Sequence, residues 1–135
     1  MAVISGLLAL SSCEDLLPGK GDDARDLLVD AWRVTENPAP GKSADEVYWV
    51  DITRHPLDTA RIIISNFYNI GANSLAEAVL SGMTLTLPSQ LLPGGFIVSG
   101  SGDIAADWVS IDWIYNVDDG SGQHETFTAE YQKLE

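Results

Sequence analysis

The sequence is short of basic residues. Its 135 residues include 7 Lys and Arg against 20 Asp and Glu, which gives a formal net charge of −13. A surface of this sign repels phosphate backbones, so we exclude nucleic acid as a partner. We interpret the acidic excess as a means of staying soluble at a crowded surface.

Catalytic and metal-binding signatures are also missing. The two histidines, His55 and His124, are far apart in the sequence and do not form a metal-ligand pair. No Gly-x-Ser-x-Gly elbow is present. We therefore expect a protein that is not an enzyme and that uses no metal or other cofactor.

Oxygen-bearing side chains do gather near the C-terminus, where they could surround Ca²⁺. Their spacing does not match an EF-hand loop, and an ordinary Asp-Gly hairpin turn explains them equally well. The residues are Asn116, Asp118, Asp119, Gln123 and Glu125.

Cysteine occurs once, as Cys13, so the chain has no internal disulfide framework. An uncharged apolar run over 2–10 precedes it, which has the length of a signal-peptide core and is too short to span a bilayer. Leu10 and two serines then lead into Cys13. This arrangement resembles the lipobox of bacterial lipoproteins, in which the cysteine thiol accepts diacylglycerol.

The lipobox resemblance implies that residues 1–12 are removed as a signal peptide and that acyl chains on Cys13 anchor the protein to a membrane. The chain starts Met1-Ala2-Val3 without a positive charge, so we expect this signal peptide to be truncated. Glu14, rather than Asp, follows the cysteine, which favours the outer membrane. The alternative is an N-terminal strand that ends in a buried cysteine.

The remaining chain predicts a tether followed by one β domain. Pro, Gly and acidic residues make 13–24 resemble a flexible tether, and a short helix capped by Asp22 or Asp23 is expected to reach Val29. A period-two hydrophobic pattern then continues to the end. It predicts about eight short strands, near 32–35, 48–53, 61–67, 75–80, 83–87, 96–101, 109–117 and 126–131. We therefore expect an all-β fold, an antiparallel up-and-down barrel over 25–135.

Several segments resemble small lipocalin-like (calycin-like) surface lipoproteins of Gram-negative bacteria. Trp32 occupies the place of the Trp in the lipocalin Gly-x-Trp motif, although Asp30 replaces the Gly. The runs 62–71, 83–90 and 99–102 fit the same group. The resemblance implies a lipocalin-like barrel that Trp32 closes at the bottom. It carries no function, because that group is defined by its fold and anchor.

Six large rings share the apolar phase of the predicted strands and should point inward. An eight-stranded barrel has room for side chains or for one small ligand. A packed core and a small apolar ligand pocket are therefore both open, and five of the rings would line the pocket. These are Tyr48, Trp113, Tyr115, Phe127 and Tyr131, with Trp32 as the sixth ring.

Trp49 and Trp108 lie on the opposite, polar phase and should point outward. An exposed Trp needs a cover, which could be the N-terminal helix or an external partner such as a glycan. We therefore expect a non-catalytic binding module for a small apolar ligand or a glycan. It would be lipid-anchored at the outer membrane, on the periplasmic or cell-surface side. The alternative is an accessory interaction subunit that contacts an outer-membrane protein.

Overall fold

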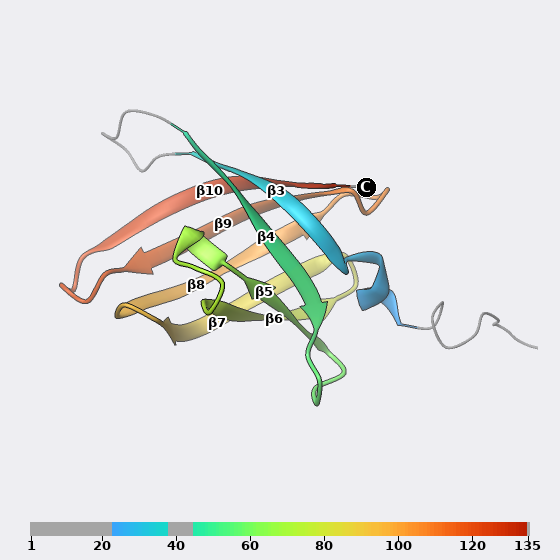
Figure 1. Cartoon of the computed structure of the whole chain (residues 1–135), viewed down its shortest axis with the longest axis horizontal. Helices are drawn as coiled ribbons and strands as arrows, with labels where there is room; N and C mark the ends of the chain where they lie inside the picture. Colours follow the sequence, from blue (N-terminus) through green and yellow to red (C-terminus); the bar gives the residue numbers. More distant parts are fainter. Residues whose placement is uncertain (1–22, 38–44, 135) are drawn as a thin grey trace, which may run out of the picture.

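The computed structural model describes residues 23–37 and 45–134, so Cys13 and the expected signal peptide and lipobox lie outside the described residues. The chain forms eight strands in a closed antiparallel barrel, in the order β10-β3-β4-β5-β6-β7-β8-β9 (Figure 1). The strands are β3 (Asp30–Glu36), β4 (Glu46–Arg54), β5 (Arg61–Ser65), β6 (Leu75–Ser81), β7 (Thr84–Leu92), β8 (Phe96–Ile104), β9 (Ser110–Asp118) and β10 (His124–Lys133). The expected all-β, up-and-down barrel is confirmed.

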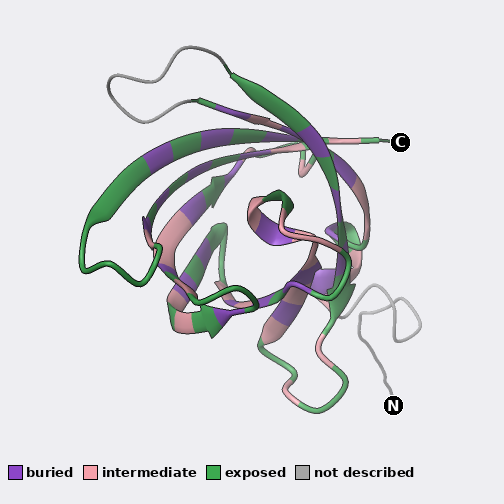
Figure 2. Ribbon diagram, turned by 60° about the vertical axis from the view of Figure 1, so that its left-hand side comes forward, coloured by how far each residue is buried: buried purple, intermediate pink, exposed green. Residues whose placement is uncertain are grey.

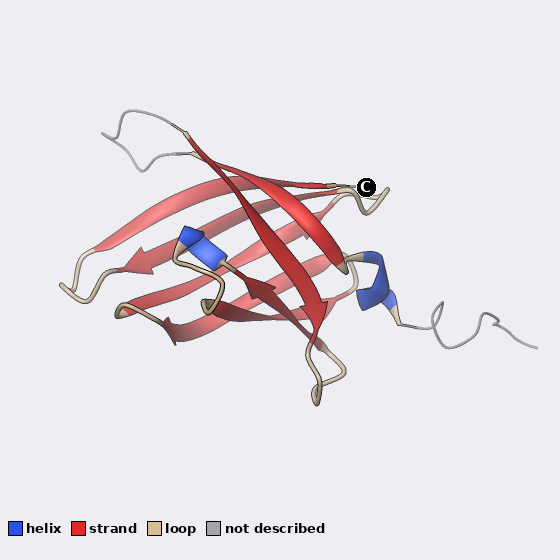
Figure 3. Ribbon diagram, viewed as in Figure 1, coloured by secondary structure: helices blue, strands red, loops and turns tan. Residues whose placement is uncertain are grey.

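Helix is limited to two single turns, and none of the described helices is long and apolar enough to cross a membrane (Figure 3). The first, η1 (Ala24–Leu27), is capped by the Asp23 side chain, which accepts a hydrogen bond from the Arg25 amide. The expected helix to Val29 is therefore shorter than predicted. Asp30 begins β3, so strand pairing takes over from the helix within three residues.

Buried residues alternate with exposed or half-buried residues along most strands (Figure 2). In β9 the buried residues are Ile111, Trp113, Tyr115 and Val117, and exposed or half-buried residues lie between them. This period of two is what a barrel with one apolar face per strand requires. All six rings that were expected to point inward are buried, with exposed fractions of 8% or less.

Two glycines of β8 make room for two of these rings. Gly100 lies opposite Tyr115, and Gly102 lies opposite Trp113. A Cβ added at Gly100 would come within 2.3 Å of the Ile114 carbonyl oxygen and 2.6 Å of Tyr115 Cα. The glycine-rich run 99–102 thus has a packing role, because it allows the strand to approach the bulky residues of β9.

The barrel seam between β6 and β7 is closed partly by a side chain. Regular pairing of these strands covers Val79 to Ser81, and a register shift between Leu87 and Gln90 interrupts the pairing of β7 with β8. The Gln90 amide then bonds both the N–H and the carbonyl of Glu77, at 2.8 and 2.9 Å. These side-chain bonds continue the connection between β6 and β7 beyond their three paired positions.

One end of the barrel is fixed by η1. The buried Arg25 guanidinium pairs with Asp23 at 2.7 Å and donates to the carbonyls of Asp58 and Arg61 at 3.0 and 2.9 Å. The pairing with Arg25 holds the pKa of Asp23 well below its usual range. The indole N–H of the fully buried Trp32 donates to the Leu28 carbonyl at 2.8 Å. Trp32 is therefore part of this closed end, as the lipocalin resemblance implies.

The second helical turn, η2 (Phe67–Asn69), lies within the ring of strands when the barrel is viewed nearly end-on (Figure 2). Phe67 was expected in the third strand, but β5 ends at Ser65 and Phe67 is a buried residue of η2. Left-handed backbone at Asn66, Tyr68 and Asn69 turns the chain inward at this point. A non-glycine residue rarely adopts this conformation, so the pattern of side chains did not indicate it.

Three residues that were expected on strands lie in turns instead. Met83 and Val109 are exposed and precede β7 and β9. Trp108 was expected on the outer face of a strand, but it lies in the turn before β9 with φ of 64°. Its ring packs partly against the core, so its cover is partly intramolecular.

The close approach at Gly100 predicts a sharp effect of one methyl group. We expect Gly100→Ala to destabilise the protein by about 1–3 kcal/mol, because the added Cβ would meet backbone that cannot move aside. Ser99→Ala, on the same strand, should change stability by less than about 0.5 kcal/mol. Urea unfolding of both variants measures this. Equal midpoints for the two variants would contradict the packing role of Gly100.

Candidate functional site

The candidate site is a polar cluster inside the apolar barrel. Glu36 is the last residue of β3 and continues the inward phase of Trp32 and Val34. Its side chain is 3% exposed, and its Oε2 accepts a hydrogen bond from the Tyr115 hydroxyl. A buried carboxyl is costly unless it is paired or protonated, so Glu36 is the feature of the interior that most needs an explanation.

Burial, with a smaller contribution from the charge of Glu46, raises the pKa of Glu36 to about 7. The hydrogen bond from Tyr115 and the neighbouring Tyr48 hydroxyl act in the opposite direction. Near neutral pH the carboxyl can therefore change its charge in response to a small change in its surroundings. Burial, together with the charge of Glu36, also raises the pKa values of Tyr48, Tyr115 and Tyr131, so these hydroxyls stay protonated.

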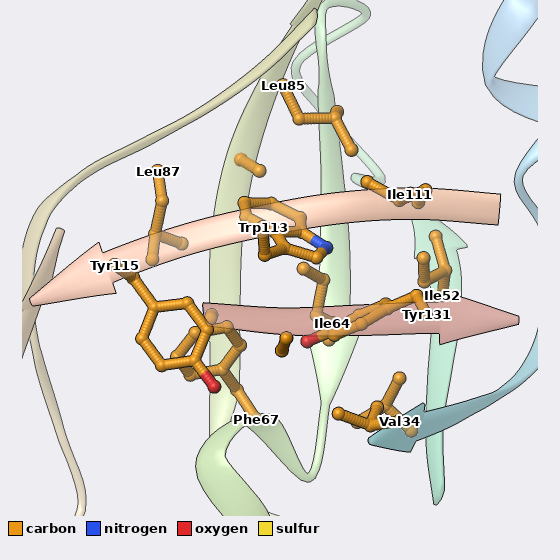
Figure 4. Close-up of a cluster of buried hydrophobic side chains, with 14 of the residues drawn as sticks. Val34, Ile52, Ile64, Phe67, Leu85, Leu87, Ile111, Trp113, Tyr115 and Tyr131 are labelled. Carbon is orange, nitrogen blue, oxygen red and sulfur yellow. The ribbon is translucent and has the colours of Figure 1, made fainter. Parts of the chain in front are cut away.

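Three buried polar atoms have no hydrogen-bond partner among the described residues. They are the hydroxyls of Tyr48 and Tyr131 and the indole N–H of Trp113. Their residues are 6%, 0% and 2% exposed. Trp113 and Tyr131 lie side by side inside the barrel, with ring centroids 5.6 Å apart (Figure 4). Each unpartnered group costs free energy on burial unless a water or a ligand satisfies it.

Tyr68 of η2 lies between this cluster and the open end of the barrel. Its ring contacts Phe96, Phe127 and Tyr115, with centroids 5.6, 5.4 and 6.5 Å away. A hollow of about 190 Å³ lies outside it, and Tyr68 and Phe96 form part of its wall. We call this hollow the mouth. Its other lining residues are Val117, Asp119, Ser121, Gln123 and Glu125.

The mouth is acidic. After burial, the charges of Glu36, Glu125, Glu46 and Asp119, in that order, raise the pKa of Tyr68 to about 12. The charges of these four carboxyl groups, which come from β3, β4, β10 and the turn before β10, therefore act on the Tyr68 hydroxyl. Hydrogen bonds from Ser121 lower the pKa of Asp119 and keep it charged.

The five residues that were predicted to line a pocket are brought together by the barrel. Tyr48, Trp113, Tyr115, Phe127 and Tyr131 all belong to one core. Tyr115 and Phe127 stack with centroids 6.0 Å apart. Whether they bind a ligand is still a prediction. Glu36 and Tyr68 were missed, although the alternation of Trp32 and Val34 could have revealed Glu36 had it been followed one step further.

The two predicted surface residues lie apart. Trp49 is 49% exposed on the outer face of β4, opposite Arg33 of β3. Trp108 instead lines a hollow of about 650 Å³ at the η1 end of the barrel, together with Arg25 and Met83. The two tryptophans therefore do not form one surface site.

Other chemistry finds no support in the described residues. No group of three or more His, Cys, Asp or Glu that could hold a metal occurs within 23–37 and 45–134. The Asp118 and Asp119 side chains instead cap the amides of the β9–β10 turn, where Gly120 and Gly122 have positive φ. An ordinary hairpin turn therefore accounts for the residues that were considered for Ca²⁺.

Comparison with known proteins finds no matching family model and no curated protein that matches the chain. The resemblance to lipocalin-like lipoproteins is therefore still a prediction.

The charge of Glu36 should make stability depend on pH. Because its pKa in the folded state lies above the ordinary value of 4.5, the folded protein binds more protons than the unfolded chain between these values. Stability should therefore fall as pH rises from about 4.5 to above 7. We expect Glu36→Gln to remove this pH-dependent loss of stability. The change in unfolding free energy that the substitution causes should be more favourable at pH 8 than at pH 4, by up to about 3 kcal/mol.

Urea unfolding at pH 4 and pH 8 measures this difference. Glu130→Gln is the matched control, since Glu130 is exposed on the outer face of β10 and makes the same charge change. The control should show no comparable pH-dependent gain. An equal effect of Glu36→Gln at both pH values would show that the pKa of Glu36 is not raised in the folded protein.

Proposed function

We propose that this chain is a lipid-anchored, non-catalytic binding module that takes a small, mostly apolar ligand into the half of its barrel nearer the mouth. The observation that carries the proposal is the set of three unpartnered polar atoms on Tyr48, Trp113 and Tyr131 inside an aromatic interior. Pockets for small molecules combine apolar walls with a few polar groups that fix orientation. An interior that served stability alone would favour Phe at such tyrosine positions.

The position of η1 supports the anchoring part of the proposal. The described chain begins at Asp23, and the η1 end of the barrel carries exposed apolar side chains. These are Leu27, Leu57, Met83, Val109 and Leu134. About ten residues would separate a lipidated Cys13 from Asp23. Acyl chains on Cys13 would thus hold this apolar end near the bilayer of the outer membrane and leave the acidic mouth in water.

A partner on the outer surface is the second candidate function. Trp49 and Val47 are 49% and 55% exposed on the same face of β4. A ring that is half exposed on a flat strand could stack on a glycan or pack against an outer-membrane protein. This is the accessory role that the sequence left open.

The anchor predicts a change of location. We expect wild-type protein, expressed from its own gene in a Gram-negative host, to incorporate a labelled fatty acid and to sediment with membranes. Cys13→Ser should lose the label and appear in the soluble fraction, because the nucleophilic thiol is gone. Ser12→Ala keeps a small residue before the cysteine and should behave like wild type. Membrane association of Cys13→Ser without label would contradict the anchor.

The ligand predicts a spectroscopic change. We expect an apolar fluorescent probe to quench tryptophan emission of residues 14–135 saturably and at one-to-one stoichiometry, because Trp113 adjoins the proposed pocket. Trp49→Phe removes the exposed ring and should leave this response intact, whereas Trp113→Phe should abolish it. A response that disappears in Trp49→Phe would instead assign binding to the outer face. No response in any variant would contradict the pocket.

A further inference from the structure

We propose that the mouth and upper interior of the barrel bind a small organic cation, an amine on a compact apolar body, with Glu36 as its counter-ion. This inference rests on the proposed function and specifies the chemistry of the ligand. It depends on how carboxyl groups, aromatic rings and unpartnered hydroxyls are arranged along one path into the barrel.

Carboxyl groups lie at the start of this path. Glu46, Asp119 and Glu125 lie at the open end, and Glu36 lies further in. Among the described residues, the Lys and Arg side chains lie elsewhere: Arg25, Arg54, Arg61 and Lys133 are at the η1 end, and Arg33 is on the outer side of β3. His124 begins β10 at the mouth end and is exposed. Carboxylates at the entrance of a low-dielectric cleft concentrate cations there and repel anions. The ligand should therefore carry a positive charge.

The aromatic rings favour an organic cation over a hard metal ion. Tyr68 and Phe96 form part of the mouth wall, and Phe127 and Tyr115 lie directly behind Tyr68. Ring faces attract ammonium groups and also pack against an apolar body. A metal ion would need several oxygen ligands at short range, and no such group of acids occurs in the described residues.

The interior supplies the acceptors that an ammonium group needs. The hydroxyl of Tyr48 lies beside Glu36 and Tyr115, where it lowers the pKa of Glu36, and within the described residues it forms no hydrogen bond of standard geometry. The Tyr131 hydroxyl is unpartnered and fully buried. Oxygen atoms of both hydroxyls can accept hydrogen bonds from an ammonium, and the Glu36 carboxylate can neutralise its charge. The Trp113 N–H can only donate, so it would suit an oxygen on the ligand or a water.

The Tyr68 ring is the barrier on this path. Its backbone has φ of 59°, and the flanking Asn66 and Asn69 are also left-handed. The Asn66 side chain fixes this turn by donating to the Trp49 carbonyl at 2.7 Å and accepting from the Gly71 amide at 2.8 Å. The turn is therefore well held, so the proposal requires the Tyr68 side chain, and not the backbone of η2, to move.

Three probes that share a phenyl ring on a two-carbon chain test the charge. They are 2-phenylethylammonium, 2-phenylethanol and 3-phenylpropanoate, titrated into residues 14–135 by calorimetry at pH 8. We expect the ammonium to bind at least ten times more tightly than the alcohol, and the carboxylate not to bind. Glu36→Gln should reduce the advantage of the ammonium to less than threefold, whereas Glu130→Gln should retain it.

The pH dependence gives a second readout. The probe ammonium stays charged between pH 5 and 8, so weaker binding at pH 5 would report protonation of carboxyl groups in the site. Several groups face Glu36 from neighbouring elements and could contribute. The loss of affinity between pH 8 and pH 5 is therefore assigned to Glu36 only if it is larger in the wild type than in Glu36→Gln. These groups are Glu46, Tyr48, Tyr68, Tyr115 and Tyr131.

The outcomes separate the two proposals. Equal affinity for the alcohol and the ammonium would contradict a cationic ligand but would still support an apolar pocket. Binding of none of the probes, with ordered water on Tyr48 and Tyr131 in a crystal structure, would overturn both. A preference for the ammonium that survives Glu36→Gln would overturn Glu36 as the counter-ion.

Discussion

The narrow interior of an eight-stranded barrel is the constraint on which the rest of this structure depends. Such a barrel has room for its own side chains or for one small ligand. A bulky ring that points inward therefore needs space, which a small residue opposite can provide. Gly100 and Gly102 meet this requirement for Tyr115 and Trp113. Because space is so limited, each buried polar atom without a hydrogen-bond partner lowers the stability of the fold. Such an atom indicates a role other than packing.

The interior divides into two halves with different chemistry. Near η1, the polar groups are satisfied: the Trp32 indole bonds the Leu28 carbonyl, and the Arg25 guanidinium bonds carbonyls of the β4–β5 turn. Toward the mouth, Glu36 is buried and the hydroxyls of Tyr48 and Tyr131 are unpartnered. The same barrel thus has one end arranged for stability and another that is incompletely satisfied. Functional sites are commonly found where local satisfaction is incomplete.

The sheet could be predicted from the sequence because alternation is a local signal. Leu85 and Leu87, or Trp113 and Tyr115, reveal their strand and its inward face without knowledge of the neighbours. The site could be predicted only in part. Its aromatic walls follow from the same alternation, but Glu36 breaks the apolar pattern and was not counted with its strand. Tyr68 depends on a left-handed turn that Asn66 and Asn69 favour but that a tyrosine rarely adopts, so its position could not be read from the sequence. The turn is held instead by long-range bonds such as that from Asn66 to Trp49.

The two ends of the barrel differ in charge. At the η1 end the carboxyl groups of Asp23, Asp26 and Asp58 pair with Arg25, Arg54 and Arg61, whereas the described residues that line the mouth include no Lys or Arg. Exposed apolar residues occur at both ends, such as Leu57 and Leu134 near η1 and Leu91 and Ile97 near the mouth. Carboxylates avoid a lipid surface because burial there would remove their hydration. A barrel tethered by its η1 end would therefore hold its mouth in water, away from the bilayer. A ligand would then reach Glu36 from the aqueous side, and a soluble amine fits that route better than a lipid.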